Sequence, residues 1–173
     1  MQCTAKVEAQ DFNLGFEEAT LRAWSPVGKP EDFRMGIDST VYFEGGQSLF
    51  IQNAVPTQNF GGMMQFLPHN LKGDSIEVSV MVKLLGVIDP SKLGFILRID
   101  PNIHFTNSYE ENIHGTRDWK RYSIKGKLDP ARTSAIAFGV FLSGQGRVWA
   151  DKFEVLVDGK PIHQAMYSAF VPD

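Results

Sequence analysis

Apolar and polar residues alternate along several stretches of the chain, and this pattern predicts β-strands. Over residues 75–84 every second side chain is apolar, beginning at Ile76, and most of the positions between are polar, beginning at Glu77. Over residues 135–142 large apolar residues again occupy every second position, with Ala137, Gly139 and Phe141 between them. A period of two puts the apolar residues on one face, which is typical of a half-buried strand. Further strands are predicted at Ser48–Asn53, 94–100, 120–127 and Arg147–Val157.

Turn-forming residues separate these runs, and the prolines lie mostly between the predicted strands, as a sheet ladder requires. Many short strands with long connections, without regular alternation with helices, indicate an all-β, antiparallel β-sandwich with jelly-roll connectivity. One short helix or turn is predicted around residues 109–113. We expect residues 1–173 to form a single domain, in which 1–10 and 164–173 are peripheral tails.

The composition of the chain excludes several classes of protein and of binding partner. The 173 residues are 43% hydrophobic with a net charge of −3, which excludes a disordered chain. A sequence pI near 5.8 and the lack of a Lys/Arg cluster give no electrostatic reason to expect nucleic acid as a partner. No apolar run approaches the roughly 20 residues that cross a bilayer. Cys3 is the single cysteine, so neither an intramolecular disulfide nor a four-cysteine zinc site is expected.

Catalytic motifs are not found in the sequence. It contains no phosphate-binding loop, no dinucleotide-binding glycine motif and no G-x-S-x-G nucleophile turn. A glycosidase needs two carboxyl groups in one active site. Adjacent acidic residues in a strand point to opposite faces of the sheet and so cannot form such a pair. Glu110 and Glu111, expected in a loop, could still supply one member of such a pair. We therefore expect no enzymatic activity, and a glycosidase-like hydrolase remains the third hypothesis.

Two polar and aromatic segments are candidates for a binding site. They are residues 100–111, which follow the strand that carries Arg98, and residues 57–63, and both are expected to be loops. Flat aromatic rings stack on the apolar faces of sugars, and fixed polar groups bind the hydroxyls. The predicted carbohydrate-binding residues are Phe60 and Tyr109 as stacking rings, with Arg98, His104 and Asn107 as hydroxyl partners. The alternative is ordinary loop composition, with both rings packed under the loops.

Asp151 does not fit a purely structural interpretation. The strand parity of Arg147–Val157 puts Asp151 on one apolar face with Trp149 and Phe153. A buried carboxylate is costly unless it is paired, hydrogen-bonded or metal-bound. We expect Asp151 to be buried near an expected strand at 13–17 and satisfied there by a cation or by backbone N–H groups. A bulge that turns Asp151 outward is the alternative.

The order of short motifs along the chain resembles the carbohydrate-binding-module type of galactose-binding-like jelly roll. The matching segments are 13–17 (NLGFE), 44–49 (EGGQSL), 115–122 (GTRDWKRY) and 138–155, which ends in VWADKFEV. The second half is also similar to accessory β-sandwich domains found beside bacterial hydrolases and peptidases. The resemblance covers nearly the whole chain and implies a non-catalytic module that binds carbohydrate. A structural or protein-interaction domain without a small ligand is the alternative.

The resemblance also implies a structural calcium ion where the first and last strands meet, with Glu17 and Asp151 as the matching ligands. The second aspartate of the family pattern is Lys152 here, and its ammonium group disfavours calcium. The family further suggests a bacterial cell-envelope or secreted protein, with a signal or lipid-anchor segment before this numbering. A reading frame that starts at Met1 would instead place the protein in the cytoplasm.

Overall fold

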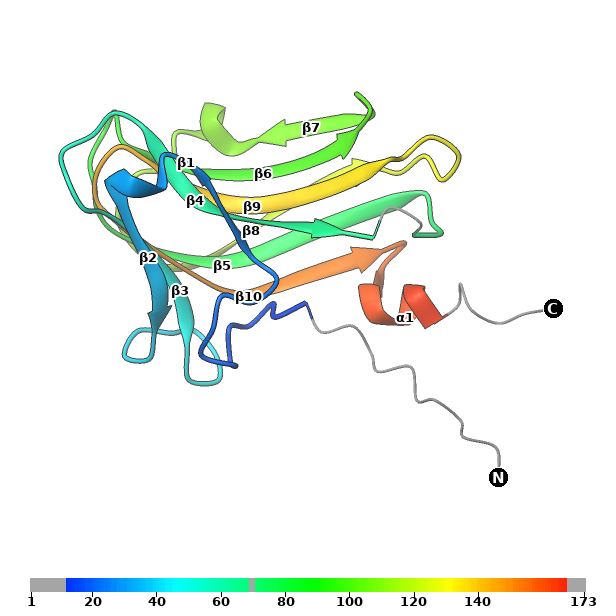
Figure 1. Ribbon diagram of the computed structural model, residues 1–173, viewed down its shortest axis with the longest axis horizontal. Coiled ribbons are helices and arrows are strands. Elements are labelled where there is room, and N and C mark those ends of the chain that lie inside the picture. Colours follow the sequence, from blue (N-terminus) through cyan, green and yellow to red (C-terminus); the bar gives the residue numbers. More distant parts are fainter. Residues whose placement is uncertain (1–11, 69–70, 168–173) are drawn as a thin grey trace.

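The computed structural model describes residues 12–68 and 71–167, which form two β-sheets packed face to face (Figure 1). Within those residues no helix is long and apolar enough to cross a membrane. The expected tail at 1–10 lies outside the described residues. Of the other expected tail, residues 164–167 belong to a short helix, α1 (Ile162–Tyr167), and the remainder lies outside as well.

The five-stranded sheet has the order β1-β4-β9-β6-β7, and every pairing in it is antiparallel. Its strands are β1 (Ser25–Gly28), β4 (Phe60–Leu67), β9 (Ala135–Ser143), β6 (Lys92–Asp100) and β7 (His104–Asn107).

The six-stranded sheet has the order β2-β3-β10-β5-β8, also antiparallel, and a short strand β11 pairs with β10. Its strands are β2 (Phe33–Asp38), β3 (Ser48–Asn53), β10 (Arg147–Val157), β5 (Ser75–Val87), β8 (Gly115–Lys127) and β11 (Lys160–Pro161). The predicted all-β antiparallel sandwich is confirmed.

The core lies between the two sheets and is built by the alternation seen in the sequence. The side chains of β5 that point inward are fully buried, from Ile76 to Leu84, and those of β6 and β9 meet them from the other sheet. The strands predicted from alternation are all present, several of them longer than expected. The helix or turn predicted around 109–113 is a 3-10 helix, η2 (Ser108–Glu111).

Two segments expected as loops are partly strands. Phe60 begins β4, and His104–Asn107 form β7 at the edge of the five-stranded sheet. Alternation did not reveal β4 because its sequence begins FGGMMQ, and its outward-facing Gly62 and Met64 are as buried as its inward-facing residues. With four residues, β7 is too short to show a period.

The N-terminal segment closes one side of the sandwich without forming the expected strand at 13–17. Phe16 adopts a positive φ of 60°, and its ring packs 5.3 Å from that of Trp24 between ring centroids. The indole Nε1 of Trp24 donates to the backbone carbonyl of Asn13 at 3.0 Å. The amide of Phe153 in β10 donates to the carbonyl of Leu14 at 3.0 Å, so the segment is attached to the last long strand.

A β-bulge interrupts β10 and corrects the predicted parity. Asp151 pairs with Met81 of β5 but Glu154 pairs with Ser79, so β10 holds one extra residue, and Lys152 takes a φ of 49°. The bulge reverses the alternation. Phe153 points into the core, whereas Trp149 lies on the outer face of the six-stranded sheet. The expected single apolar face that includes Trp149 is therefore wrong.

Candidate functional site

The outer face of the five-stranded sheet carries a row of side chains that the core does not use. In β6, alternate residues such as Leu97 belong to the core, so Arg98 lies on the opposite face. The strand register aligns it with three residues of neighbouring strands: Phe66 of β4 pairs with Ala137 of β9, Ala137 pairs with Arg98, and Arg98 pairs with Phe105 of β7. Paired residues of antiparallel strands share a face.

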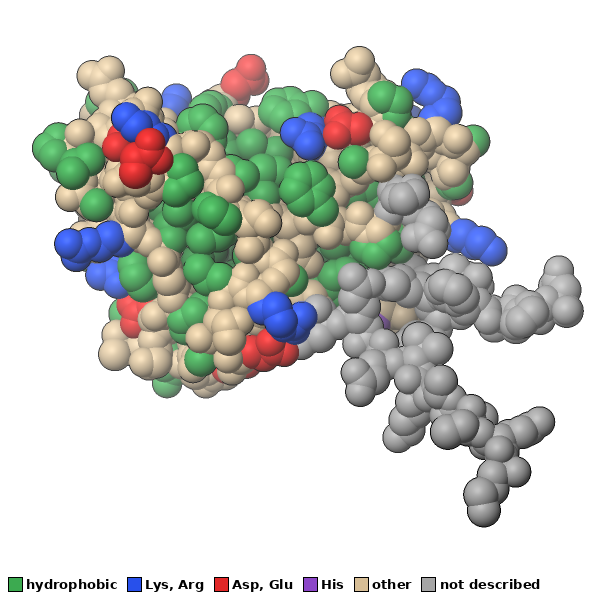
Figure 2. All heavy atoms as spheres, viewed as in Figure 1, with side chains coloured by type: hydrophobic (Ala, Val, Ile, Leu, Met, Phe, Trp, Pro, Cys, Tyr) green, Lys and Arg blue, Asp and Glu red, His purple; other side chains and the backbone are tan. Residues whose placement is uncertain are grey.

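Two aromatic rings of this row are exposed. Phe66 is 59% exposed and Phe105 63%. They are three strand spacings apart, or roughly 14 Å between backbones at about 4.8 Å per spacing. Between the rings, Ala137 of β9 is only 1% exposed, so larger neighbouring side chains cover it. Figure 2 shows hydrophobic side chains reaching the surface where Figure 1 draws β4, β6 and β9.

Arg98 and Asp100 form an ion pair on the same face. The Nε of Arg98 lies 3.2 Å from Oδ2 of Asp100. The geometry is not that of a hydrogen bond, and within the described part of the chain this shielded Nε has no hydrogen-bond partner. Alternate residues of β6 point the same way, so the pair presents donors and acceptors together to anything lying on the sheet.

A cavity of about 350 Å³ opens at the hairpin between β6 and β7, beside this row. Its lining includes Arg98, Asp100, His104 and Phe105, together with Ile99, Asn102 and Ile103. The cavity therefore joins two of the predicted hydroxyl partners to the exposed ring of Phe105.

His104 turns its ring away from the outer face. It pairs with Ile99, a core residue, and a Cβ added at Gly126 of β8 would lie 3.0 Å from its Cδ2. The ring nitrogen Nε2 lies 2.6 Å from Oγ1 of Thr106, and burial lowers the pKa of the imidazole. His104 thus borders the cavity from the inner side.

The side-chain oxygen of Asn107 already has a structural role in this protein. Its side-chain oxygen accepts a hydrogen bond of 3.1 Å from the amide of Tyr109, which caps the 3-10 helix η2. Asn107 pairs with Ile96 and so lies on the outer face, one row from Arg98.

Phe60 and Tyr109 pack against a third ring, Phe141 of β9. The centroid distances are 5.1 Å from Phe60 and 5.2 Å from Tyr109 to Phe141, which is itself only 2% exposed. The ammonium of Lys92 lies 5.1 Å from the centroid of Tyr109, over its face. Burial raises the pKa of the Tyr109 phenol. Phe60 keeps an exposed side at the rim, whereas one face of Tyr109 is covered.

The structure therefore places Phe60, Arg98, Asn107 and Tyr109 on one face. Their roles in binding stay predictions. Phe66 and Phe105 are not among the predicted residues, although Phe66 follows Phe60 by six residues, and an even spacing in one strand puts two side chains on the same face. The parity of β4 is the available signal, but the sequence predicts a loop at 57–63 and no strand at 64–67.

Asp151 is buried, with 1% of its surface exposed, as expected. The loop between β2 and β3 covers it: Oδ2 accepts hydrogen bonds from the amides of Phe43 at 2.9 Å and Glu44 at 3.0 Å. Oδ1 accepts from the amide of Lys152 at 2.7 Å. Burial raises the pKa of Asp151, these amides oppose the rise, and the charge of Glu17 adds to it. Backbone N–H groups thus satisfy the carboxylate, one of the two expected solutions.

The donor set does not match a calcium site. Calcium takes six to eight oxygen ligands. Within residues 12–68 and 71–167, no group of three or more His, Cys, Asp or Glu side chains could hold a metal. Both lone pairs of Asp151 Oδ2 face amides, and the carboxylate of Glu17 accepts from the amide of Gly46 at 3.1 Å. Glu17 and Asp151 as calcium ligands stay a prediction that chelation tests.

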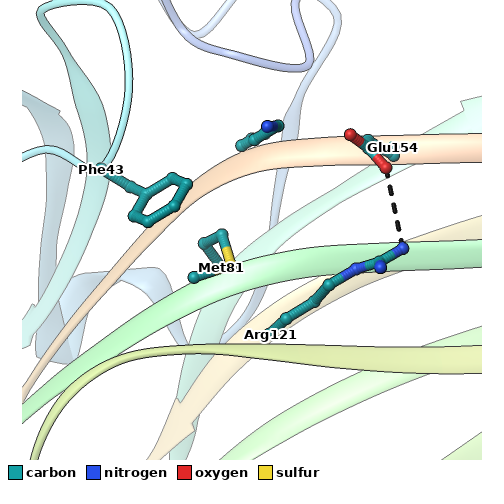
Figure 3. A pocket seen from close by; sticks show the side chains of 5 residues that line it. Phe43, Met81, Arg121 and Glu154 are labelled. Atoms are coloured by element: carbon teal, nitrogen blue, oxygen red, sulfur yellow. Dashed lines mark ion pairs between the residues drawn. The ribbon is translucent and has the colours of Figure 1, made fainter.

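A second cavity, of about 150 Å³, lies on the six-stranded sheet (Figure 3). Phe43, Met81, Arg121, Lys152 and Glu154 line it. Nη2 of Arg121 and Oε2 of Glu154 form an ion pair at 3.7 Å across its rim. None of the predicted carbohydrate-binding residues lies here.

Comparison of the sequence with known proteins finds a relative in Bacillus subtilis. No family model matches the chain. A protein of Bacillus subtilis (strain 168), described as the uncharacterized HTH-type transcriptional regulator YbfP, is 32% identical over 146 residues, which cover 79% of this chain. The match covers 48% of the relative, so the chain spans about half the length of that protein.

Solved structures with a similar fold include carbohydrate-binding modules. TmCBM61, solved in complex with β-1,4-galactotriose, has a TM-score of 0.63 at 16% identity and covers 84% of this chain and 95% of its own. The C-terminal family 22 module of Clostridium thermocellum Xyn10B has a TM-score of 0.58 at 15% identity, covering 88% and 100%.

An enzyme shares the fold too. Fisc, a Stig cyclase from Fischerella sp. TAU, has a TM-score of 0.64 at 15% identity, covering 86% of this chain and 96% of its own. Identities this low establish the architecture alone. The chain has the jelly-roll β-sandwich fold of carbohydrate-binding modules.

Proposed function

We propose that this chain is a non-catalytic carbohydrate-binding module whose ligand lies across the outer face of the five-stranded sheet. The observation that carries the proposal is the row in which Phe66 and Phe105 stay exposed on either side of Ala137 and Arg98. Exposure of two apolar rings to water is unfavourable in free energy. A ligand that covers both rings would remove this cost.

The chemistry of the row suits a sugar. An aromatic ring presents a flat apolar surface to the C–H face of a pyranose. The Arg98–Asp100 pair presents donors and acceptors to hydroxyl groups, and Asn107 adds an amide one row away. Rings on strands whose backbones lie roughly 14 Å apart suit an extended oligosaccharide better than a single sugar, because one pyranose is too small to contact both.

The shared fold supports this proposal. The two modules compared above are named for carbohydrate binding, one of them bound to a galactose trimer. The complex of TmCBM61 indicates that this architecture can accept an oligosaccharide, and the exposed row is the surface that we propose for one in this chain.

A hydrolytic role finds less support in the described cavities. Glycoside hydrolysis uses two carboxyl groups beside the bond that is cut. The cavity lined by Asp100 contains no second carboxylate among its lining residues. Glu111 lines a different cavity, with Lys120 and Tyr122 but no other acid.

Binding to a panel of soluble polysaccharides tests the proposal, with affinity gel electrophoresis as the readout. Phe66→Ala and Phe105→Ala should each weaken binding roughly 3- to 10-fold, on the order of 1 kcal/mol for a lost ring contact. Tyr42→Ala is the matched control, because Tyr42 is 44% exposed and belongs to the loop beside the six-stranded sheet. Retardation by no polysaccharide, or an equal effect of all three variants, would reject the proposal.

The Bacillus relative motivates a second candidate. That protein is described as a transcriptional regulator, and the match covers about half of it. Under this alternative the chain is a sensing or interaction part of a larger protein. The location of the protein in the cell envelope stays a prediction. A small soluble sugar that binds while polysaccharides do not would favour this candidate.

A further inference from the structure

We propose that Asp100 makes the binding face selective for uncharged sugars, and this inference rests on the proposed function. Arg98 and Asp100 are both on the outer face of β6, and both line the 350 Å³ cavity at the β6–β7 hairpin. Their side chains are 43% and 36% exposed, so a ligand lying on the sheet can reach both.

Arg98 alone would favour an acidic ligand. A guanidinium group offers donors in a planar fork that matches a carboxylate or sulfate. Asp100 already supplies a carboxylate to this fork, with Oδ2 3.2 Å from Nε. An acidic sugar would have to displace Asp100 or lie beside a like charge, and either arrangement costs free energy.

An uncharged sugar uses the same pair without that cost. Its hydroxyl groups can donate to Asp100 and accept from Arg98 at the same time.

Other charges near the cavity do not reverse this balance. His104 is the remaining titratable residue of its lining, and its ring turns toward Thr106 and Gly126 on the inner side. Lys92 shares the outer face of β6 but lies at the opposite end of the strand, over the ring of Tyr109. Asp100 therefore decides whether the face carries a net positive charge at Arg98.

Asp100→Asn tests this role, because it removes the charge and keeps the shape of the side chain. The probes are a neutral galactan, a neutral xylan and polygalacturonate, titrated against each protein at low and high salt. The wild type should bind a neutral polysaccharide at least tenfold more tightly than polygalacturonate. Asp100→Asn should raise the affinity for polygalacturonate about tenfold, and added salt should remove the gain.

Asp118→Asn is the matched control. It makes the same change in net charge on β8 of the other sheet, where Asp118 pairs with Lys83 at 3.5 Å. Asp100→Ser provides a second removal of the carboxylate, and thermal melting confirms folding of each variant.

The outcomes separate the two claims. If the wild type binds neutral polysaccharides but Asp100→Asn gains no affinity for polygalacturonate, or Asp118→Asn gains as much, the inference is wrong and the proposed function stands. The inference is also wrong if the wild type prefers polygalacturonate. If no probe binds any of the proteins, the proposed function fails and the inference fails with it.

Discussion

The indole Nε1 of Trp149 donates a hydrogen bond of 2.9 Å to Oδ2 of Asp38, which joins β10 to the end of β2 across the outer face of the six-stranded sheet. Arg147 lies 3.1 Å from the same oxygen, and its guanidinium packs over the ring of Trp149 at 4.9 Å. Thr40 satisfies the other oxygen of Asp38 through its hydroxyl at 2.7 Å. The carboxylate of Asp38 thus connects β2 to β10 and to the start of the loop that follows β2.

The stability of the protein should fall in acid because of Asp38. Burial opposes ionisation, but the hydrogen bonds from Trp149 and Thr40 outweigh it and lower the pKa of Asp38 from 3.8 to about 2. A lowered pKa means that stability is present above pH 3.8 and is lost as the pH falls through 2. The loss should be about 2 kcal/mol.

Urea unfolding of the wild type and Asp38→Asn between pH 5 and pH 2 measures this contribution. The variant should be less stable at pH 5, and the difference should shrink toward pH 2. Parallel stability curves over this range would show that Asp38 is not held as described.

Removal of the Asp151 carboxylate should destabilise the fold. Asp151→Ala would leave the amides of Phe43, Glu44 and Lys152 without their acceptor, at a cost of about 3 kcal/mol in the free energy of unfolding. Asp151→Asn keeps one acceptor oxygen and should cost less. Equal stability of Asp151→Ala and the wild type in urea would refute this role.

The pH dependence of that cost has a defined sign. Burial raises the pKa of Asp151 above 3.8. The stability that this group contributes is therefore complete below pH 3.8 and decreases as the pH rises through its pKa in the folded protein. The difference between the wild type and Asp151→Ala should be larger at pH 3.5 than at pH 7.

Chelation should leave the melting temperature unchanged, because the chain's own amides satisfy Asp151. A ligand that binds only the folded state raises Tm, and its removal lowers Tm. The comparison is thermal melting in EDTA and in millimolar calcium. A fall of several degrees in EDTA that calcium reverses, and that Glu17→Gln abolishes, would establish the calcium site.

Gly94→Ala should destabilise the fold by about 1–3 kcal/mol through overpacking. A Cβ at Gly94 would clash with Cε2 and Cζ of Phe141, whose ring lies against that glycine. Gly15→Ala is the matched control, because its nearest neighbour, Cγ of Glu17, would lie at an ordinary 3.7 Å. Equal unfolding free energies for the two variants would contradict this packing.

The fold was largely predictable from alternation, because one buried face and one solvated face give a clear period of two. The prediction failed where both faces are covered. On β4 the outward-facing Gly62 and Met64 are buried, so the segment shows no period, and its first residues fall in the loop predicted at 57–63. The bulge at Lys152 puts Trp149 and Phe153 on opposite faces of β10. Nothing in the local sequence indicates a positive φ at this lysine.

The candidate site was only partly predictable. The sequence indicated Arg98 and its neighbouring segments, because polar and aromatic residues are concentrated there. The pairing of Phe66 with Ala137 and of Arg98 with Phe105 depends on the order of four strands, which a single sequence does not specify. The two most exposed rings of the face were therefore missed.

Mapping of amide chemical shifts by NMR during titration with a neutral oligosaccharide would locate the binding surface residue by residue. We expect the largest shifts on the outer face of the five-stranded sheet, at Phe66, Ala137, Arg98 and Phe105, and at the β6–β7 hairpin. Shifts centred on the cavity of Phe43 and Met81 in the other sheet, or no saturable shift with any neutral oligosaccharide, would contradict it.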